Sequence, residues 1–179
     1  MTLTDLYQRP GFLLRRTHQI SAAVFENACA SVGLTPAQYG VLTVLAAEPG
    51  LDQTRLSRAL AFDKVTVMRV LKGLEERGLL KREQSALSRR QKTEALTPAG
   101  TALLAAAREP AERAYHRLLS PLDAAQRLQL IELLQTLTNG LADEARAPFV
   151  PLDPAGTKAD KVRTTSGRTT AADPRRPRD

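Results

Sequence analysis

The side chains best suited to chemistry are basic and hydroxyl-bearing residues between positions 53 and 97. This stretch holds 11 Lys and Arg residues against 5 Asp and Glu, although the whole chain of 179 residues has a net charge of only +7. The rest of residues 1–147 has 8 basic and 10 acidic side chains, so the positive charge is concentrated in one block. Concentrated positive charge favours a polyanionic partner, of which double-stranded DNA is the first candidate.

A helix is expected within this block from Lys64 to Arg77, with Asp63 as its N-cap. When such a helix enters the major groove, its N-terminal residues reach the bases. Arginine can bind guanine through two hydrogen bonds, threonine can bind a base or a phosphate, and valine can contact a thymine methyl group. The residues expected to contact DNA are Lys64, Thr66, Val67 and Arg69, whereas Leu71 and Leu74 are expected to face inward.

A short helix capped by Asp52 precedes this helix and ends near residue 60, and the pair forms a helix-turn-helix pattern. On the short helix, Thr54, Arg55 and Arg58 are suited to backbone phosphates. Such contacts position a protein on DNA without reading its sequence.

Two short segments, residues 79–83 and 91–96, follow the second helix and predict a β-hairpin, the wing of a winged helix. Arg89 and Arg90 at its tip can follow the minor groove, where narrow A·T-rich stretches are most negative. The sequence therefore predicts DNA contacts from the wing as well.

Further helices are expected at about residues 11–31, 35–47, 97–119 and 120–140, the last opened by Ser120 and Pro121. The expected fold is mainly α with a small β-hairpin wing. The first and last two helices expose more apolar surface than a chain of this size can cover, so a homodimer is expected. Residues 10–33 and 98–147 would form the helical dimerisation region and 34–97 the winged helix-turn-helix domain. Residues 148–179, rich in Pro and Thr, would be a disordered basic tail.

The segments LTPAQYGVL, LDQTRLSRAL, DKVTVMRVLKGLEERGLLKR and RRQKTEALTPAG resemble the MarR family of bacterial transcription regulators. The resemblance covers roughly residues 10–145 and implies a homodimeric repressor that binds a pseudo-palindromic operator. The family's wing usually carries an Asp before the two arginines, and Ser88 stands there in this chain. The leading RPGFLLRRTHQI also resembles members that respond to aromatic acids or their thioesters.

A small-molecule effector would need a pocket, and the helix at 11–31 offers polar groups beside an apolar stripe. The residues considered for an aromatic acid are Arg15, His18, Ser21, Phe25 and Tyr39. The other interpretation of this pattern is a histidine near the dimer core and arginines that face solvent. His116 is expected on a solvated helix face.

Several classes of function lack support in the sequence. One cysteine and two histidines make no zinc-ligand pattern, and the sequence predicts no cofactor. No nucleophile elbow or phosphate-binding glycine loop occurs, so an enzyme is not expected. A soluble cytoplasmic protein is expected, because no long apolar run or leader pattern appears. The alternatives are a non-specific architectural DNA-binding protein and a thiol-based redox sensor, although Cys29 is expected to be a buried, inert thiol.

Overall fold

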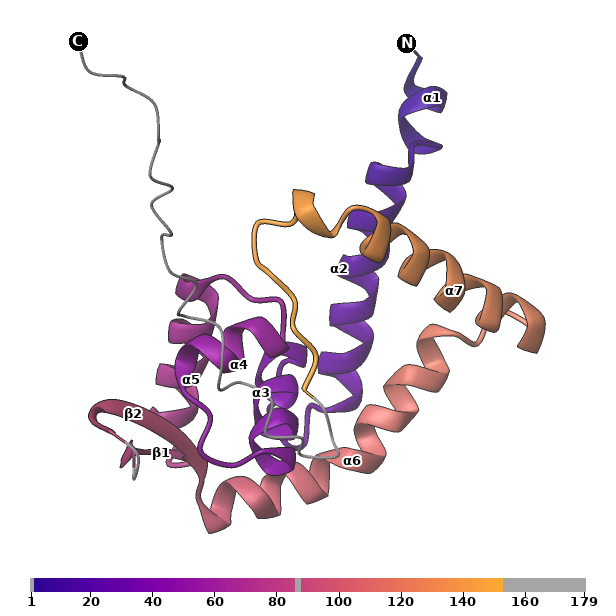
Figure 1. Ribbon diagram of the computed structural model, residues 1–179. Helices are drawn as coiled ribbons and strands as arrows, with labels where there is room; N and C mark the ends of the chain where they lie inside the picture. Colours follow the sequence, from indigo (N-terminus) through magenta and orange to yellow (C-terminus); the bar gives the residue numbers. More distant parts are fainter. Residues whose placement is uncertain (1, 86–87, 153–179) are drawn as a thin grey trace, which may run out of the picture.

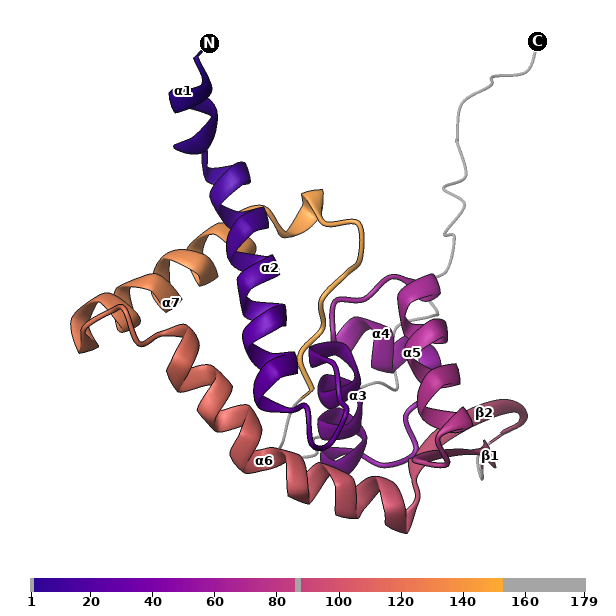
Figure 2. The same cartoon turned by 180° about the vertical axis from the view of Figure 1, so that it is seen from behind.

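The computed structural model describes residues 2–85 and 88–152, without the side chains of 85 and 88–91. Within this part a winged helix-turn-helix lies beside three long helices (Figure 1). The view from behind shows α6 running from the wing along one side of the molecule to the corner where α7 begins (Figure 2). The elements are α1 (Leu3–Tyr7), α2 (Pro10–Ala28), α3 (Pro36–Ala47), α4 (Gln53–Ala59), α5 (Lys64–Glu76), β1 (Leu80–Ser85), β2 (Ser88–Leu96), α6 (Pro98–Leu118), α7 (Ala124–Gly140) and the short 3-10 helix Ala142–Glu144.

The core lies where α3, α4 and α5 pack together against the first half of α6. Leu42, Leu56 and Leu71 are almost completely buried there, and α6 adds Leu104 and Ala107 to the same cluster. Burial of each such leucine stabilises the fold by about 1.5–3 kcal/mol. The core therefore fixes the helix-turn-helix as one rigid unit and joins it to α6.

Local capping signals determine where most helices begin. The Thr35 hydroxyl oxygen accepts from the backbone N–H of Gln38, and the Gln38 side-chain oxygen accepts from the backbone N–H of Thr35. Asp52 and Asp63 cap α4 and α5, as predicted. The predicted start of the last helix at Ser120 and Pro121 is wrong. That helix, α7, is capped by Asp123 instead, while the Ser120 hydroxyl donates to the carbonyl of Arg117 at the end of α6.

The wing is an antiparallel hairpin, as predicted, in which Leu80 pairs with Leu96. Its base is tied to the rest of the fold through Thr97, whose hydroxyl donates to the carbonyl of Gly78 at 2.8 Å. A glycine is required next to this joint, because a Cβ on Gly100 would lie 2.1 Å from the carbonyl oxygen of Leu79. The wing therefore leaves the core and enters α6 through a close backbone contact.

The prediction that disorder begins at residue 148 is wrong for its first residues. The backbone N–H of Val150 donates to the carbonyl of Arg58 at 3.0 Å, and Leu152 packs against the core cluster. This segment runs from the end of α7 back to the helix-turn-helix (Figure 1). The rest of the predicted tail, residues 153–179, lies outside the described residues.

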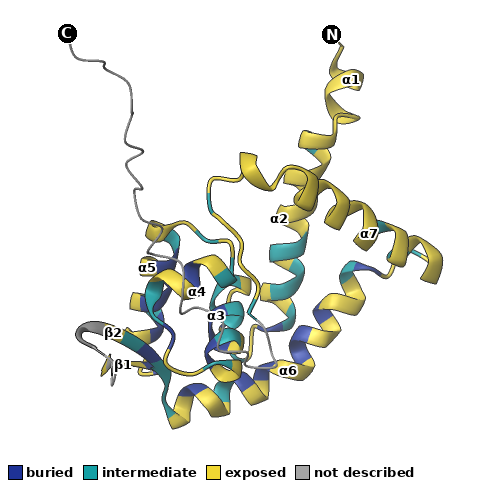
Figure 3. Cartoon of the chain, viewed as in Figure 1, coloured by how far each residue is buried: buried dark blue, intermediate teal, exposed yellow. Residues whose placement is uncertain are grey.

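Helices α1, α2 and α7 have no buried residue, whereas α3, α4, α5 and α6 each have some (Figure 3). Large apolar side chains nevertheless occupy them, and Leu128, Leu133 and Leu137 of α7 are each more than half exposed. In the part of the chain that the structure describes, no helix is long and apolar enough to cross a membrane. The structure therefore leaves the apolar faces of α1, α2 and α7 exposed, in an area larger than isolated surface leucines would make.

Candidate nucleic-acid interface and an adjoining pocket

Helix α5 presents an exposed face of mixed chemistry at its N-terminal half. Lys64 and Arg69 are exposed there, and within the described residues neither forms an ion pair. Val65 and Met68 stand beside them with 76% and 55% of their surfaces exposed. Cationic groups for phosphate or guanine and apolar groups for a thymine methyl are therefore available on one helix end.

Thr66 is a predicted DNA contact, and it also takes part in the N-terminal cap of α5. Its backbone N–H and its hydroxyl both donate to the Asp63 carboxylate, at 2.7 and 3.0 Å. These hydrogen bonds lower the pKa of Asp63, with a smaller contribution from Arg69. The cap holds the first turn of α5 and leaves the Thr66 hydroxyl oxygen able only to accept from a base or phosphate.

The prediction that Val67 contacts DNA is wrong. Val67 has no exposed surface and belongs to the core cluster together with Val70, Leu71 and Leu74. These four residues are spaced as one inward stripe of a helix, so Val67 shares the buried face of the two leucines. The apolar groups that do face outward, Val65 and Met68, were not among the predicted contacts.

The predicted phosphate contacts on α4 lie at the surface. Thr54, Arg55 and Arg58 are all exposed. The guanidinium of Arg55 is bound by the carboxylate of Glu48 at 2.7 Å, in a pair whose side chains are 56% and 37% exposed. An exposed pair of this kind is weak, at about 0–1 kcal/mol, so a phosphate can compete for Arg55.

Arg89 and Arg90 lie in β2, on the wing, but their side chains lie outside the described residues. The base of the wing holds a cluster that sequence reasoning missed. There the guanidinium of Arg82 on β1 lies 3.0 Å from the buried carboxylate of Glu94 on β2 and 4.0 Å from Glu75 on α5. Burial raises the pKa of Glu94, and the bond from Arg82 only partly offsets this. The cluster links the orientation of the wing to that of α5.

Arg77 was also missed. Its guanidinium donates to the carbonyl oxygens of Gly33 at 2.8 Å and Val32 at 3.3 Å, in the loop between α2 and α3. These bonds tie the end of α5 to the helix that leads toward the N-terminus. A basic residue at the C-terminal end of a helix was the available signal, but its distant partner could not be predicted from spacing.

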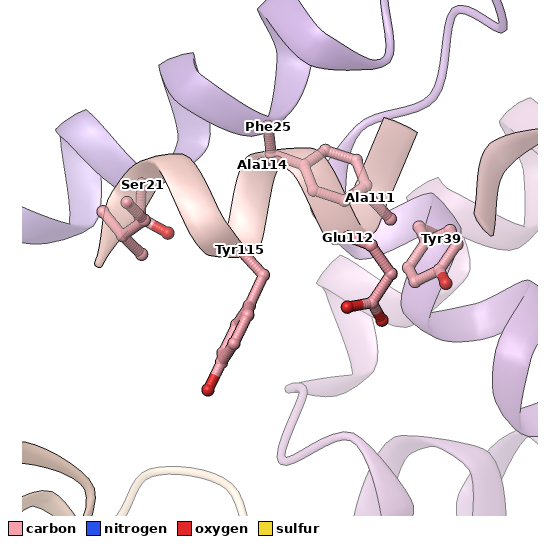
Figure 4. Close-up of a pocket in the computed structure, with 8 residues that line it drawn as sticks. Ser21, Phe25, Tyr39, Ala111, Glu112, Ala114 and Tyr115 are labelled. Carbon is pink, nitrogen blue, oxygen red and sulfur yellow. The ribbon is translucent and has the colours of Figure 1, made fainter. Parts of the chain in front are cut away.

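A pocket of about 290 Å³ lies between α2, α3 and α6. The rings of Phe25 and Tyr39 meet at its edge with centroids 5.5 Å apart. Figure 4 shows these two rings facing the stretch of α6 that carries Glu112 and Tyr115. The lining is aromatic and apolar with a single carboxylate, which suits an aromatic ligand. The lining residues are Ser21, Phe25, Tyr39, Ala111, Glu112, Ala114, Tyr115 and Leu118.

Three of the five predicted effector residues therefore come together, namely Ser21, Phe25 and Tyr39. Arg15 and His18 are exposed on α2 and do not line this pocket. Arg15 lies over the ring of Phe12 and donates to Gln19, both on its own helix. The acidic Glu112, which the sequence did not single out, takes a place in the pocket that the cations were expected to hold.

Cys29 is completely buried, as predicted. Burial raises the pKa of its thiol, and the charge of Arg113 only partly opposes this. A buried thiol with a raised pKa is a poor nucleophile toward peroxide, so the redox-sensor alternative loses support. His116 is exposed, as predicted. Within the described ranges, no three His, Cys, Asp or Glu side chains are grouped to hold a metal ion.

A rigid helix-turn-helix, an exposed cationic α5 and a β-hairpin wing together define a winged-helix DNA-binding protein. Residues 32–91 match the family model described as MarR family. The chain is also 35% identical over 128 residues to a transcriptional regulatory protein for the hcr operon from Thauera aromatica, covering 71% of this chain and 77% of that protein. The chain belongs to the MarR family, and it is a transcriptional regulator.

Two solved structures give the same fold. BpsR of Bordetella bronchiseptica, described with 6-hydroxynicotinic acid as the regulator of its DNA binding, is 30% identical with a TM-score of 0.70, over 74% of this chain and 95% of that one. The repressor CouR bound to a 23-mer DNA duplex is 34% identical with a TM-score of 0.70, over 77% of this chain and 98% of that one.

Proposed function

We propose that this protein is a homodimeric repressor that binds a pseudo-palindromic operator and is released by an aromatic acid or its thioester. The observation that carries the proposal is α5, whose buried stripe fixes it in the core while Lys64, Val65 and Arg69 face outward. A helix held in this way can enter the major groove as a rigid body. Its mixed face supports sequence preference in addition to phosphate binding.

The exposed leucines of α7 and the apolar residues of α1 and α2 support the homodimer. A second copy can cover the same faces of the first, because a two-fold axis pairs identical surfaces. Two recognition helices related by that axis read half-sites about one turn of DNA apart, roughly 34 Å.

The pocket supports control by a small molecule. It lies between α2, which carries exposed apolar surface, and α3, which packs on α5 within the core. A ligand that binds better to one arrangement of these helices than to another shifts DNA affinity by that difference. The names of the relatives that bind CoA thioesters or hydroxynicotinic acid point to the aromatic class.

Footprinting on the DNA that flanks the protein's own gene tests this proposal. We expect protection of two half-sites, competition by specific duplex far exceeding that by scrambled duplex, and release by a member of a panel of aromatic acids and thioesters. Equal competition by scrambled duplex would instead identify an architectural DNA-binding protein with a steep salt dependence.

A further inference from the structure

A second pocket of about 260 Å³ lies between α3 and α6 and is also bordered by Tyr39. Tyr39 lines both pockets, one next to α2 and the other next to the end of α3, so the two pockets share this residue. Each pocket alone is just below the usual range for ligand sites, about 300–1,000 Å³, so a ligand of ordinary size would need space in both. The second pocket is lined by Tyr39, Thr43, Ala46, Ala47, Leu104 and Arg108.

Helix α6 runs along both pockets. The residues that it contributes run from Leu104 to Leu118 and recur with each turn, which places them on one side of the helix. At 1.5 Å per residue this stripe is about 20 Å long. Arg108 and Glu112 lie about 6 Å apart along this stripe, so an elongated ligand bordered by Tyr39 could reach both.

The two pockets carry opposite charges. Among the described residues that line them, Arg108 is the only cation and Glu112 the only anion, one helical turn apart. Within the described part of the chain, Arg108 forms no hydrogen bond or ion pair, whereas nearby Arg113 is paired with Glu109. The guanidinium of Arg108 thus keeps its donors for an anion, and Glu112 can accept from a hydroxyl but repels a carboxylate.

We propose that the second pocket binds the anionic end of an elongated effector through Arg108. The aromatic ring lies against Phe25 and Tyr39, with a ring hydroxyl donating to Glu112, and the carboxylate or phosphate extends past Tyr39 to the guanidinium. The ligand class is a hydroxylated aromatic ring joined by a short chain to an acidic group. This assignment rests on the effector control proposed above, and it moves the acid-binding role from Arg15 and His18 to Arg108.

Direct binding to the full-length protein without DNA tests the assignment by calorimetry. The probe is phloretate, which carries a phenol, a two-carbon chain and a carboxylate, and its neutral amide phloretamide is the chemical control. Arg108→Gln should weaken phloretate binding by about tenfold or more, the effect of removing a charge-assisted hydrogen bond. It should leave phloretamide within about twofold, because removal of the cation does not touch the ring site. Arg113→Gln, which lies outside both pockets, should change neither affinity.

Glu112→Gln provides the complementary measurement. It should reduce the advantage of phloretate over hydrocinnamate, which lacks the ring hydroxyl, since the carboxylate that accepts from that hydroxyl is gone. Unchanged phloretate affinity in Arg108→Gln, equal losses for acid and amide, or a loss caused by Arg15→Gln instead would each overturn the assignment. Failure of the unmodified protein to bind phloretate would overturn it too. Operator footprinting decides separately whether the regulator proposal stands.

Discussion

The backbone N–H of Val150 donates to the carbonyl oxygen of Arg58 at 3.0 Å, so a residue beyond α7 closes on the end of the first helix of the helix-turn-helix. Arg58 is also a predicted phosphate contact, and its carbonyl lies where α4 ends. Helix α7, whose leucines are exposed, is thereby joined to the DNA-binding unit through this segment as well as through α6.

Leu152 should anchor this connection. Leu152→Ala is expected to lower the free energy of unfolding by about 1–2 kcal/mol, because part of an apolar side chain leaves the core. Urea unfolding at a fixed protein concentration measures the change. Phe149→Ala is the matched control, since Phe149 is 62% exposed and its removal should stay within about 0.5 kcal/mol. Equal effects of the two substitutions would mean that the segment contributes no packing.

Glu94 should make stability depend on pH. Its pKa is raised in the folded protein, which means that the folded state favours the protonated carboxyl. The stability that goes with this protonated form is fully present below the ordinary pKa of 4.5 and is lost as the pH rises through the folded-state pKa. The free energy of unfolding of the unmodified protein should therefore fall relative to that of Glu94→Gln as the pH rises above about 4.5. Urea unfolding across this interval checks it. A difference that moves in the opposite direction would show that the ion pair with Arg82 outweighs burial.

Val65 and Val67 lie on the same helix, and their substitutions should affect DNA binding and stability separately. Val67→Ala should destabilise the fold by about 1.5–3 kcal/mol, because Val67 is fully buried. Val65→Ala should leave stability within about 0.5 kcal/mol and weaken operator binding, because its methyl groups face outward. Thermal unfolding and operator titration of both variants give the answer. Wild-type operator affinity in Val65→Ala would remove this residue from the interface.

Signals contained within a few residues predicted structure well. The capping pair of Thr35 and Gln38 needs no distant partner, and it marks the start of α3 in the sequence and in the structure. Two such signals compete before α7, and the one at Asp123 prevails because Ser120 is used at the end of α6. The wrong prediction for Val67 was avoidable, because Val67 lies two helical turns, or seven residues, before Leu74 and so falls on the same buried face.

The site was harder to predict because it depends on packing between distant segments. Spacing along α2 places His18 and Phe25 on related faces, yet only the position of α6 decides which of them borders the pocket. The sequence pattern singled out neither Glu112 nor Arg108. Leu152 follows Phe149 and Val150 in a short apolar run, which is too short for a periodic pattern to indicate which of them contacts the core.

The apolar face of α7 should hold the dimer together. Leu137→Asp is expected to yield monomers, because an aspartate buried at an apolar interface would lack a partner for its charge. Sedimentation equilibrium measures the change, and operator affinity should fall with it. Gln135→Asp adds the same charge to the same helix about 200° away from Leu137 and should leave the dimer intact. A dimeric Leu137→Asp variant would place the interface elsewhere.

Arg69 and Arg90 should contribute to DNA binding in different ways. Arg69 lies on the exposed face of α5 within its first two turns, so Arg69→Ala should cost about 1–3 kcal/mol and relax preference at one position in each half-site. Arg90 lies in β2 on a wing where Ser88 replaces the usual acidic residue. Its alanine variant should weaken binding to all sequences more evenly. The slope of log affinity against log salt concentration should become shallower by about one unit for each phosphate that the wing no longer neutralises. Sites with A·T-rich flanks should suffer most, because the narrow minor groove attracts arginine. Titration of both variants against operator and scrambled duplexes at several salt concentrations separates the two roles. If both variants bind operator like the unmodified protein, the winged-helix docking proposed for this chain fails and DNA must contact another surface.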